Sequence, residues 1–317
     1  MMKQFICEER YAEQMRDVVL PYLNSRRTDE QLPSFDGKPL HVATFRADEP
    51  IAEAVVAHGF TESIEKYHEV IYYLLTAGMN VTIYEHRGHG RSYRAVKNNS
   101  WTHIDRFEEY ILDLEAIVNR VKEKSDLPRF LLGHSMGGAV VALYLEKHPT
   151  DFAKAVLLSP MIAPSTGNFP VWVAKLICRT AILFGKSKKR IFNGKDYPGI
   201  ERFEDACSSS EPRFQYYNEI KSTHPEYQNF APTYRWLIES LGVTKKILAK
   251  GAVEKIKIPV LLVQATQDYV VRLEPQNEFV DRLPNGKIVH ADCKHESFDS
   301  PDNVWRELIE TILAFLA

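Results

Sequence analysis

A serine stands inside the run Gly-His-Ser-Met-Gly at residues 133–137. An apolar run over residues 129–132 precedes it and a helical pattern opens at Met136, which predicts a sharp turn from a strand into a helix. Glycines at such a turn let neighbouring backbone approach without a Cβ collision. Ser135 would then lie at a helix N-terminus, where free N–H groups favour a developing negative charge. The pattern predicts a nucleophilic serine; the alternative is a glycine-rich turn that only packs a helix on a sheet.

The partners that a serine nucleophile needs follow later in the chain. A serine hydroxyl is a weak nucleophile until a base takes its proton, so a histidine oriented by a carboxylate is required. Asp268 follows the apolar run at residues 260–265, and His295 follows the run at residues 287–290. The carboxyl ends of strands in an open α/β sheet share one edge. We therefore expect Ser135, Asp268 and His295 to meet as nucleophile, acid and base.

Two of these roles have alternative interpretations. Among the eleven histidines, His290 lies in the predicted strand itself, whereas His295 follows Asp268 at a loop tip. Asp268 could instead be a simple turn aspartate, and His295 a solvated loop histidine. Asp292, in the same loop as His295, is the second choice of acid.

Acyl transfer also requires hydrogen-bond donors for the oxyanion. One is expected from the backbone N–H of Met136, directly after the nucleophile. The other is expected from Phe60, because the turn His58-Gly59-Phe60 follows the predicted strand at residues 52–57. The alternative interpretation of this second segment is an ordinary β-turn.

Short β-branched and apolar runs alternate with helical patterns along the chain, which predicts an α/β fold with a mostly parallel sheet flanked by helices. The predicted strands are residues 41–45, 52–57, 80–84, 129–132, 154–158, 260–265 and 287–290. The predicted helices are residues 66–75, 107–124, 136–147, 274–283 and 303–315. Most of the strands are unbroken apolar runs, as expected when both faces of a sheet are buried.

One segment interrupts this alternation. Residues 161–257 are helix-prone and aromatic with no clear strand, and they are too long for a simple loop. We predict an inserted helical lid there, with the core formed by residues 1–160 and 258–317. The segment carries 16 Lys and Arg against 9 Asp and Glu, although the whole chain has a net charge of −2. A basic lid on an acidic body is therefore expected.

Composition excludes several classes of protein. The chain of 317 residues is 44% apolar and 26% charged, as in soluble globular proteins. A net charge of −2 argues against a nucleic-acid binder. The N-terminal ten residues do not resemble a secretory signal, and no apolar stretch approaches the ~20 residues that span a bilayer. We expect a cytoplasmic protein or one bound peripherally to a membrane surface.

The sequence lacks the motifs of zinc, nucleotide and NAD chemistry. The four cysteines form no CxxC pair, and the sequence has no HExxH, P-loop or strand-borne GxGxxG. His86 and His89 lack a carboxylate or thiol partner at ligand spacing, so no metal site is predicted. No cofactor is implied.

Several motifs together resemble the α/β-hydrolase superfamily. They are the turn at residues 58–60, the run Glu-His-Arg-Gly-His-Gly-Arg-Ser at residues 85–92, the Gly-His-Ser-Met-Gly-Gly run at residues 133–138, and the placement of Asp268 and His295. Within the superfamily they are similar to bacterial lysophospholipases and monoacylglycerol lipases. The resemblance covers about residues 35–317. Glu85 departs from it, because this branch usually has Asp there; the position is expected to be structural.

The predicted lid bears on the substrate. Residues 169–184 are mostly apolar with Lys175 and Arg179 on one face, and the basic run at residues 186–190 follows. A basic amphipathic segment of this kind can lie in a lipid interface and attract anionic headgroups. The alternative is a lid helix packed over the active site with a solvated basic loop. A lid that bound a substrate amine would need carboxylates, and the basic excess argues against that function.

The resemblance implies a serine carboxylic-ester hydrolase that cleaves the acyl ester of a lysophospholipid or monoacylglycerol through an acyl-enzyme. One alternative is a general short-chain carboxylesterase. Another is a non-catalytic protein that uses the same scaffold to bind a ligand.

Overall fold

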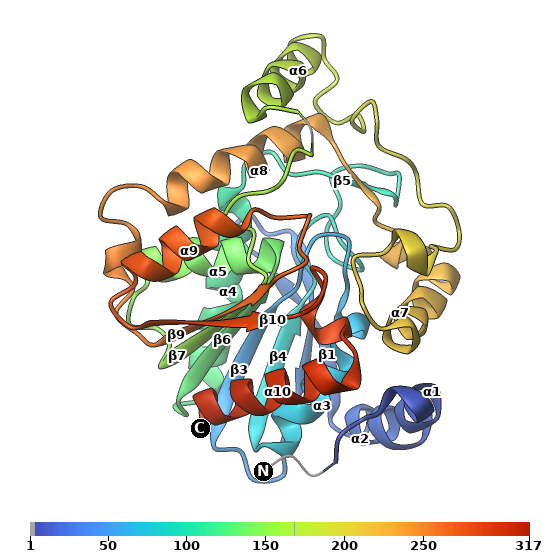
Figure 1. The fold of residues 1–317 in the computed structure, drawn as a ribbon, viewed down its shortest axis with the longest axis vertical. Coiled ribbons are helices and arrows are strands. Elements are labelled where there is room, and N and C mark those ends of the chain that lie inside the picture. Colours follow the sequence, from blue (N-terminus) through green and yellow to red (C-terminus); the bar gives the residue numbers. More distant parts are fainter. Residues whose placement is uncertain (1–3, 168) are drawn as a thin grey trace.

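Eight strands form the central sheet in the order β1-β2-β4-β3-β6-β7-β9-β10. β2 is antiparallel to both β1 and β4, and the remaining neighbours are parallel. The architecture comes from a computed structural model that describes residues 4–167 and 169–317 (Figure 1). The strands are β1 (Arg27–Pro33), β2 (Pro39–Phe45), β3 (Ala52–Ala57), β4 (Met79–Tyr84), β6 (Arg129–His134), β7 (Lys154–Leu158), β9 (Val260–Ala265) and β10 (Gly286–Ala291). The predicted α/β fold with a mostly parallel sheet is confirmed.

The edge strand β1 was not predicted from the sequence. Its residues, Arg-Thr-Asp-Glu-Gln-Leu-Pro, are mostly polar, and the strand is half exposed. β1 is held through its backbone pairing with β2 rather than by an apolar face. The other seven strands were predicted because they carry apolar runs, which the helices cover on both faces of the sheet.

Helices cover the two faces of the sheet (Figure 1). α3 (His68–Thr76) and α10 (Asp302–Leu316) contribute to the core on one face. α4 (Glu108–Lys124), α5 (Met136–Lys147) and α9 (Leu273–Arg282) contribute to the core on the other. These helices lie within two residues of the predicted ranges, except that residues 64–67 form the 3₁₀ turn η3 before α3.

The N-terminal residues, which lie outside the family resemblance, form a helical arm. After the turn η1 (Glu8–Arg10), the arm consists of α1 (Tyr11–Gln14), the π-helical turn η2 (Met15–Val19) and α2 (Leu20–Asn24). Tyr11, Met15, Val19 and Leu23 recur every four residues and are buried in the same core as α3. This spacing places them on one face of the arm. Residues 1–3 lie outside the described residues. They begin the ten-residue N-terminal segment that does not resemble a secretory signal.

Residues 161–257, here called the inserted segment, leave the sheet after β7. They contain α6 (Val171–Leu183), α7 (Glu211–Thr223) and α8 (Tyr234–Ile247), with the 3₁₀ turns η4 (Phe203–Asp205), η5 (Pro225–Tyr227) and η6 (Val253–Lys255). Helices and short 3₁₀ turns are the main regular elements of the segment. It also contains the two-residue strand β8 (Ala231–Pro232), which pairs with β5 (Trp101–Thr102) outside the main sheet. This pair connects the inserted segment to the core.

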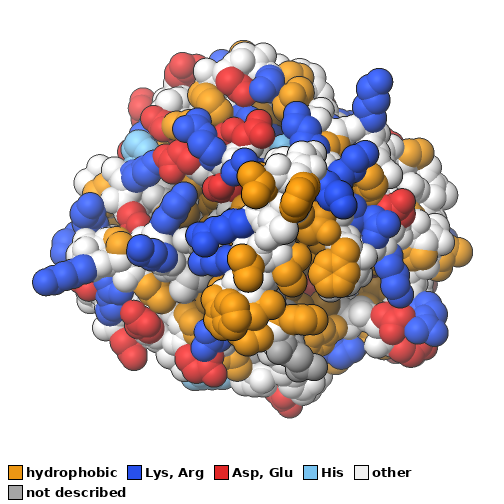
Figure 2. All heavy atoms as spheres, turned by 90° about the horizontal axis from the view of Figure 1, so that it is seen from above, with side chains coloured by type: hydrophobic (Ala, Val, Ile, Leu, Met, Phe, Trp, Pro, Cys, Tyr) orange, Lys and Arg blue, Asp and Glu red, His pale blue; other side chains and the backbone are white. Residues whose placement is uncertain are grey.

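Exposed apolar side chains gather on the face that carries α6. Figure 2 looks onto this end of the molecule, where orange side chains lie beside blue Lys and Arg side chains. The exposed large apolar residues on α6 and directly beside it are Phe169, Trp172, Leu176, Leu183 and Phe184. The face is called the α6 patch below.

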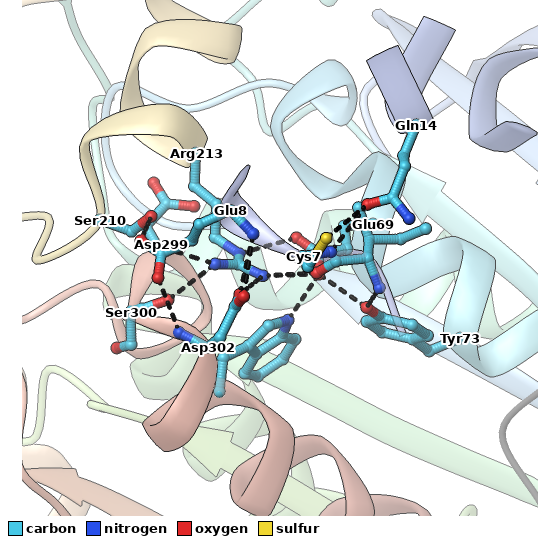
Figure 3. Close-up of polar contacts among 12 residues, drawn as sticks. Cys7, Glu8, Gln14, Glu69, Tyr73, Ser210, Arg213, Asp299, Ser300 and Asp302 are labelled. Atoms are coloured by element: carbon cyan, nitrogen blue, oxygen red, sulfur yellow. Dashed lines mark hydrogen bonds and ion pairs between the residues drawn. The ribbon is translucent and has the colours of Figure 1, made fainter. Parts of the chain in front are cut away.

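Arg213 fastens α7 to the core (Figure 3). Its side chain is fully buried and forms ion pairs with Glu69 of α3 at 3.0 Å and with Asp302 of α10 at 3.0 Å. The guanidinium also donates to the carbonyl oxygens of Ile6 and Ser300. These contacts attach α7 to the N-terminal arm, α3 and α10, and removing one partner of this buried charged network would be costly.

Candidate active site

Ser135 occupies the tight turn between β6 and α5. Its φ of +50° is unusual for a residue with a side chain, and such strain costs about 1–3 kcal/mol. Backbone hydrogen bonds hold the turn: the Ser135 N–H donates to Leu158, and its carbonyl accepts from Met161 at 2.8 Å. A Cβ on Gly137 would collide with the carbonyl oxygen of Ala57. The glycine therefore lets α5 approach β3 closely.

The structure brings Ser135, His295 and Asp268 together in one hydrogen-bonded chain. His295 Nε2 lies 2.8 Å from Ser135 Oγ, and His295 Nδ1 lies 2.6 Å from Asp268 Oδ2. The other oxygen of Asp268 accepts from the N–H groups of Val270 and Val271 at 2.8 and 3.1 Å. Both carboxylate oxygens are thus fixed. This geometry suits a histidine that takes a proton from the serine while the aspartate holds its tautomer.

The sheet explains why these three residues meet. Ser135 follows β6, Asp268 lies in the loop after β9, and His295 lies in the loop after β10. β7 pairs with both β6 and β9, and β10 pairs with β9, so the carboxyl ends of the strands share one edge. This is the edge at which open α/β sheets place their sites.

The alternative residues lie elsewhere. The Asp292 carboxylate accepts from the Gln267 side chain at 2.8 Å and is exposed, so it does not orient His295. His290 is exposed on the edge strand β10.

The two predicted oxyanion donors lie beside the serine turn. Met136 opens α5, and Phe60 lies in the turn after β3. Neither N–H donates to another atom among the described residues. The Phe60 ring packs on Trp236 of α8, with ring centroids 4.1 Å apart. In the described part of the chain, both N–H groups therefore lack a protein acceptor.

Glu62 holds the Phe60 turn in place, a role that was not predicted from the sequence. Its carboxylate accepts from the Gly59 N–H, from the Tyr67 hydroxyl at 2.6 Å and from Lys66 Nζ at 3.1 Å. Burial alone would raise the pKa of Glu62, but Lys66 and His134 hold it well below its usual range. The sequence signal was an acid three residues after the glycine of the turn, which alone does not show where the carboxylate points.

The run at residues 85–92 is structural. Arg87 makes a two-pronged ion pair with buried Asp113 of α4, at 2.6 Å from each nitrogen. Glu85 is buried and accepts from the Arg91 N–H, and burial raises its pKa to about 7. His86 packs against His58 rather than against acids. Residues 4–167 and 169–317 contain no group of three or more His, Cys, Asp or Glu arranged to hold a metal ion.

A cavity of about 450 Å³ lies under α6, within the inserted segment. Apolar and aromatic side chains dominate its wall, among them Phe169, Ile177, Cys178, Phe192, Tyr234 and Leu237. Tyr234 and Leu237 belong to α8, the helix whose Trp236 packs on Phe60. The cavity and the Phe60 turn therefore share α8 as a common neighbour, and the cavity's lining and volume suit a hydrocarbon chain.

A family model described as serine aminopeptidase, S33, matches residues 48–299. The match includes Ser135, Asp268 and His295 and most of the sheet.

Individual proteins are similar over most of their length. The probable lysophospholipase L2 of Haemophilus influenzae is 26% identical over 311 residues, which cover 93% of this chain and 97% of the relative. The monoacylglycerol lipase of Mycolicibacterium smegmatis is 25% identical over 292 residues, covering 88% and 94%. A solved structure of a thermostable carboxyl esterase from Bacillus coagulans aligns with a TM-score of 0.73 at 22% identity, covering 92% of this chain and 98% of that one. This last likeness concerns the fold.

Proposed function

The chain belongs to the serine aminopeptidase S33 family of α/β-hydrolases, in its lysophospholipase and monoacylglycerol lipase branch, and we propose that it is a serine hydrolase of single-chain lipid esters. The observation that carries the proposal is the hydrogen-bonded chain from Asp268 through His295 to Ser135. Its substrates are lysophospholipids or monoacylglycerols.

In the proposed acylation step, the Ser135 hydroxyl attacks the ester carbonyl carbon while His295 Nε2 takes its proton. The carbonyl oxygen becomes an oxyanion, which the Met136 and Phe60 N–H groups stabilise. Asp268 accepts from His295 Nδ1 and stabilises the imidazolium. The intermediate collapses when the C–O bond to the leaving alcohol breaks, and His295 gives that oxygen its proton.

Deacylation reverses these roles with water as the nucleophile. His295 takes a proton from water, the hydroxide attacks the acyl-serine, and the serine oxygen leaves with the proton from His295. The products are a fatty acid and free enzyme. Apart from water and the substrate, the proposed steps use only groups of this chain.

Two observations favour a lipid over a small soluble ester. The cavity under α6 is mostly apolar and large enough for an acyl chain. Two relatives that span most of the chain are named lysophospholipase L2 and monoacylglycerol lipase. In this proposal, the inserted segment is a lid that encloses the acyl chain of the substrate.

The α6 patch is the proposed contact with a lipid surface. Leu183 and Phe184 are 83% and 74% exposed, and Trp172 is 68% exposed. The basic run at residues 186–190 follows these residues directly. Apolar side chains can insert into a bilayer while the cations attract anionic headgroups, at about 1 kcal/mol per Lys or Arg. No helix in the described part of the chain has the length and apolar character needed to cross a bilayer.

The test uses a fluorophosphonate probe and a substrate panel. The wild-type protein should be labelled at Ser135 and should release fatty acid from lysophosphatidylcholine and monoacylglycerol. Ser135→Ala should lose both properties while its melting temperature stays near that of the wild type. Near-normal hydrolysis by Ser135→Ala would refute the mechanism. Activity on short-chain nitrophenyl esters alone would favour a general carboxylesterase, and no labelling or turnover would favour a binding protein.

A further inference from the structure

Lys66 places a buried ammonium group between two loops of the candidate active site. It belongs to the turn η3, and its side chain is only 6% exposed. Lys66 Nζ lies 2.6 Å from a carboxylate oxygen of Glu296 and 3.1 Å from one of Glu62. The Asp299 carboxylate lies further away, at 3.8 Å. The ammonium group is thus shared mainly by two carboxylates from distant segments of the chain.

Both carboxylates stand beside groups that the proposed reaction uses. Glu62 lies two residues after Phe60 and also accepts a hydrogen bond from the Gly59 N–H. Glu296 directly follows His295. One ammonium group therefore joins the turn at residues 58–60, here called the oxyanion turn, to the loop that carries His295.

His134 adds a second connection, from the residue directly before Ser135. Its ring is buried, with Nδ1 3.2 Å from Glu62 Oε1 and Nε2 3.4 Å from the carbonyl oxygen of His295. The rings of His134 and His295 also pack together, with centroids 5.1 Å apart. The segments that carry Ser135, His295 and Phe60 therefore meet in one buried polar cluster.

The strand order shows why such a link matters. The oxyanion turn follows β3, the Ser135 turn follows β6, and the His295 loop follows β10. β3 and β6 are neighbours, but β10 lies four positions away from β3 in the sheet. A spacing of about 4.8 Å between strands puts the ends of β3 and β10 about 19 Å apart. Backbone pairing therefore does not set the distance between Phe60 and His295, and contacts between the loops must do so.

The charge of Lys66 holds the two carboxylates together. Burial opposes this charge, but Glu296 and Glu62 hold the pKa of Lys66 well above its usual range. Burial likewise opposes ionisation of the two carboxyl groups, but Lys66 keeps the pKa of each below its usual range. Without the ammonium group, two buried like charges would separate or take up a proton. Either change would alter the contact between the loops that carry them.

We propose that Lys66 is a positioning residue that holds the oxyanion turn against the His295 loop, so that the Phe60 N–H and His295 act on the same ester group. The inference rests on the proposed function. Lys66 acts through Glu62 and Glu296 and not on the substrate. The alternative is an ion pair that stabilises the fold without affecting the reaction, so the experiment must separate positioning from stability.

The experiment compares the wild type with four variants. Lys66→Met removes the ammonium group and keeps a long side chain. Glu296→Gln removes one partner and keeps the pair with Glu62, so it decides the proposal if Lys66→Met does not fold. The third variant combines these two substitutions. Lys221→Met is the matched control, because Lys221 is also buried and forms an ion pair at 2.6 Å, with Glu201 of the inserted segment.

The turnover of a nitrophenyl ester gives the first result. A displacement of about 1 Å can cost about 10²-fold in rate. We expect kcat to fall about 100-fold in Lys66→Met and at least about tenfold in Glu296→Gln, with KM within about threefold of the wild type. Lys221→Met should lose stability in urea and keep kcat within about twofold. A folded Glu296→Gln with the wild-type kcat would overturn the proposal, and so would an equal loss of kcat in Lys221→Met.

The double variant shows whether Glu296 acts through Lys66. Substitutions at independent sites multiply their effects on kcat, whereas residues that share one contact do not. Once Lys66 is absent, Glu296→Gln should change kcat by less than about threefold. A further loss of about tenfold in the double variant would show that Glu296 acts independently, which would overturn the proposed link.

An inhibitor that forms an oxyanion gives a readout that stability alone does not change. A trifluoromethyl ketone that adds to Ser135 would place its oxygen at the Met136 and Phe60 N–H groups. Its inhibition constant should rise in Glu296→Gln by about the factor by which kcat/KM falls, and should stay at the wild-type value in Lys221→Met. An unchanged inhibition constant in Glu296→Gln would overturn the positioning role. A wild-type protein that neither reacts with a fluorophosphonate nor hydrolyses esters would instead refute the proposed function, so the two failures are distinguishable.

Discussion

The substitution Glu62→Gln tests how the oxyanion turn is positioned. One carboxylate oxygen accepts from the Gly59 N–H and the Tyr67 hydroxyl, and the other accepts from Lys66. A glutamine keeps the shape but replaces one oxygen with an NH₂ group. Whichever way the amide is oriented, its NH₂ group faces a donor, so Gly59 or Lys66 loses its acceptor.

The size of the effect follows from these contacts. Loss of a whole oxyanion donor costs about 10²–10³ in kcat. In Glu62→Gln, the turn at residues 58–60 should be displaced rather than unfolded, because Phe60 still packs on Trp236. We therefore expect kcat to fall about 10- to 100-fold. KM should change little, since the oxyanion forms only in the transition state. Loss of a hydrogen bond to a charged group should lower the free energy of unfolding by about 1.5–3 kcal/mol.

The assay is steady-state hydrolysis of a nitrophenyl ester, with stability measured by urea unfolding. Glu65→Gln is the matched control, because Glu65 lies one turn further along the chain and also pairs with buried or half-buried charges, at Arg27 and His68. This control should lose stability and keep kcat within twofold of the wild type. A Glu62→Gln variant that loses stability but keeps its kcat would refute the positioning role. Equal losses of kcat in both variants would do the same.

Three further predictions follow from the site and the surface. Asp268→Asn should lower kcat about 10⁴-fold with the fold intact, because His295 loses the acceptor that fixes its tautomer; circular dichroism and ester hydrolysis check this. The double substitution of Leu183 and Phe184 by Ser should weaken binding to anionic vesicles at least about tenfold in co-sedimentation, since each side chain loses ~1.5–3 kcal/mol of possible burial; unchanged binding would exclude the α6 patch. Burial opposes ionisation of Glu65, but His68 and Arg27 hold its pKa below the usual range, so its stabilisation is present at pH 7 and is lost as the pH falls below about 4.3. The free energy of unfolding should therefore decrease less between pH 7 and pH 3.5 in Glu65→Gln than in the wild type.

Local sequence patterns were sufficient to predict the central sheet. Strands such as β3 and β9 are unbroken apolar runs, because helices cover both of their faces. β1 lacked this signal. It is a polar edge strand whose place depends on its backbone pairing with β2, and such pairing leaves little trace in residue types. The helical arm at the N-terminus was not predicted either, although Tyr11, Met15, Val19 and Leu23 recur every four residues on its buried face.

In the inserted segment, the number of charged residues does not show which of them pair with one another. Its excess of Lys and Arg was taken to argue against binding of an amine. In the structure, Glu201 of the same segment forms an ion pair with Lys221 at 2.6 Å, and Asp205 forms one with Arg202 at 2.6 Å. Net charge describes the long-range field of a segment, whereas binding depends on the few groups that face the ligand. The excess of basic residues can be counted in the sequence, whereas the pairing of these acids is visible only in the structure.

The sequence by itself determined the fold class and which residue types could perform acyl transfer, because strand runs and the serine turn are local features of the chain. Tertiary structure decided the distances among Ser135, His295 and Asp268 and the contacts of Glu62 with the turn at residues 58–60. These properties depend on contacts between residues far apart in the chain. Their geometry follows from strand order and helix packing, which no local pattern encodes.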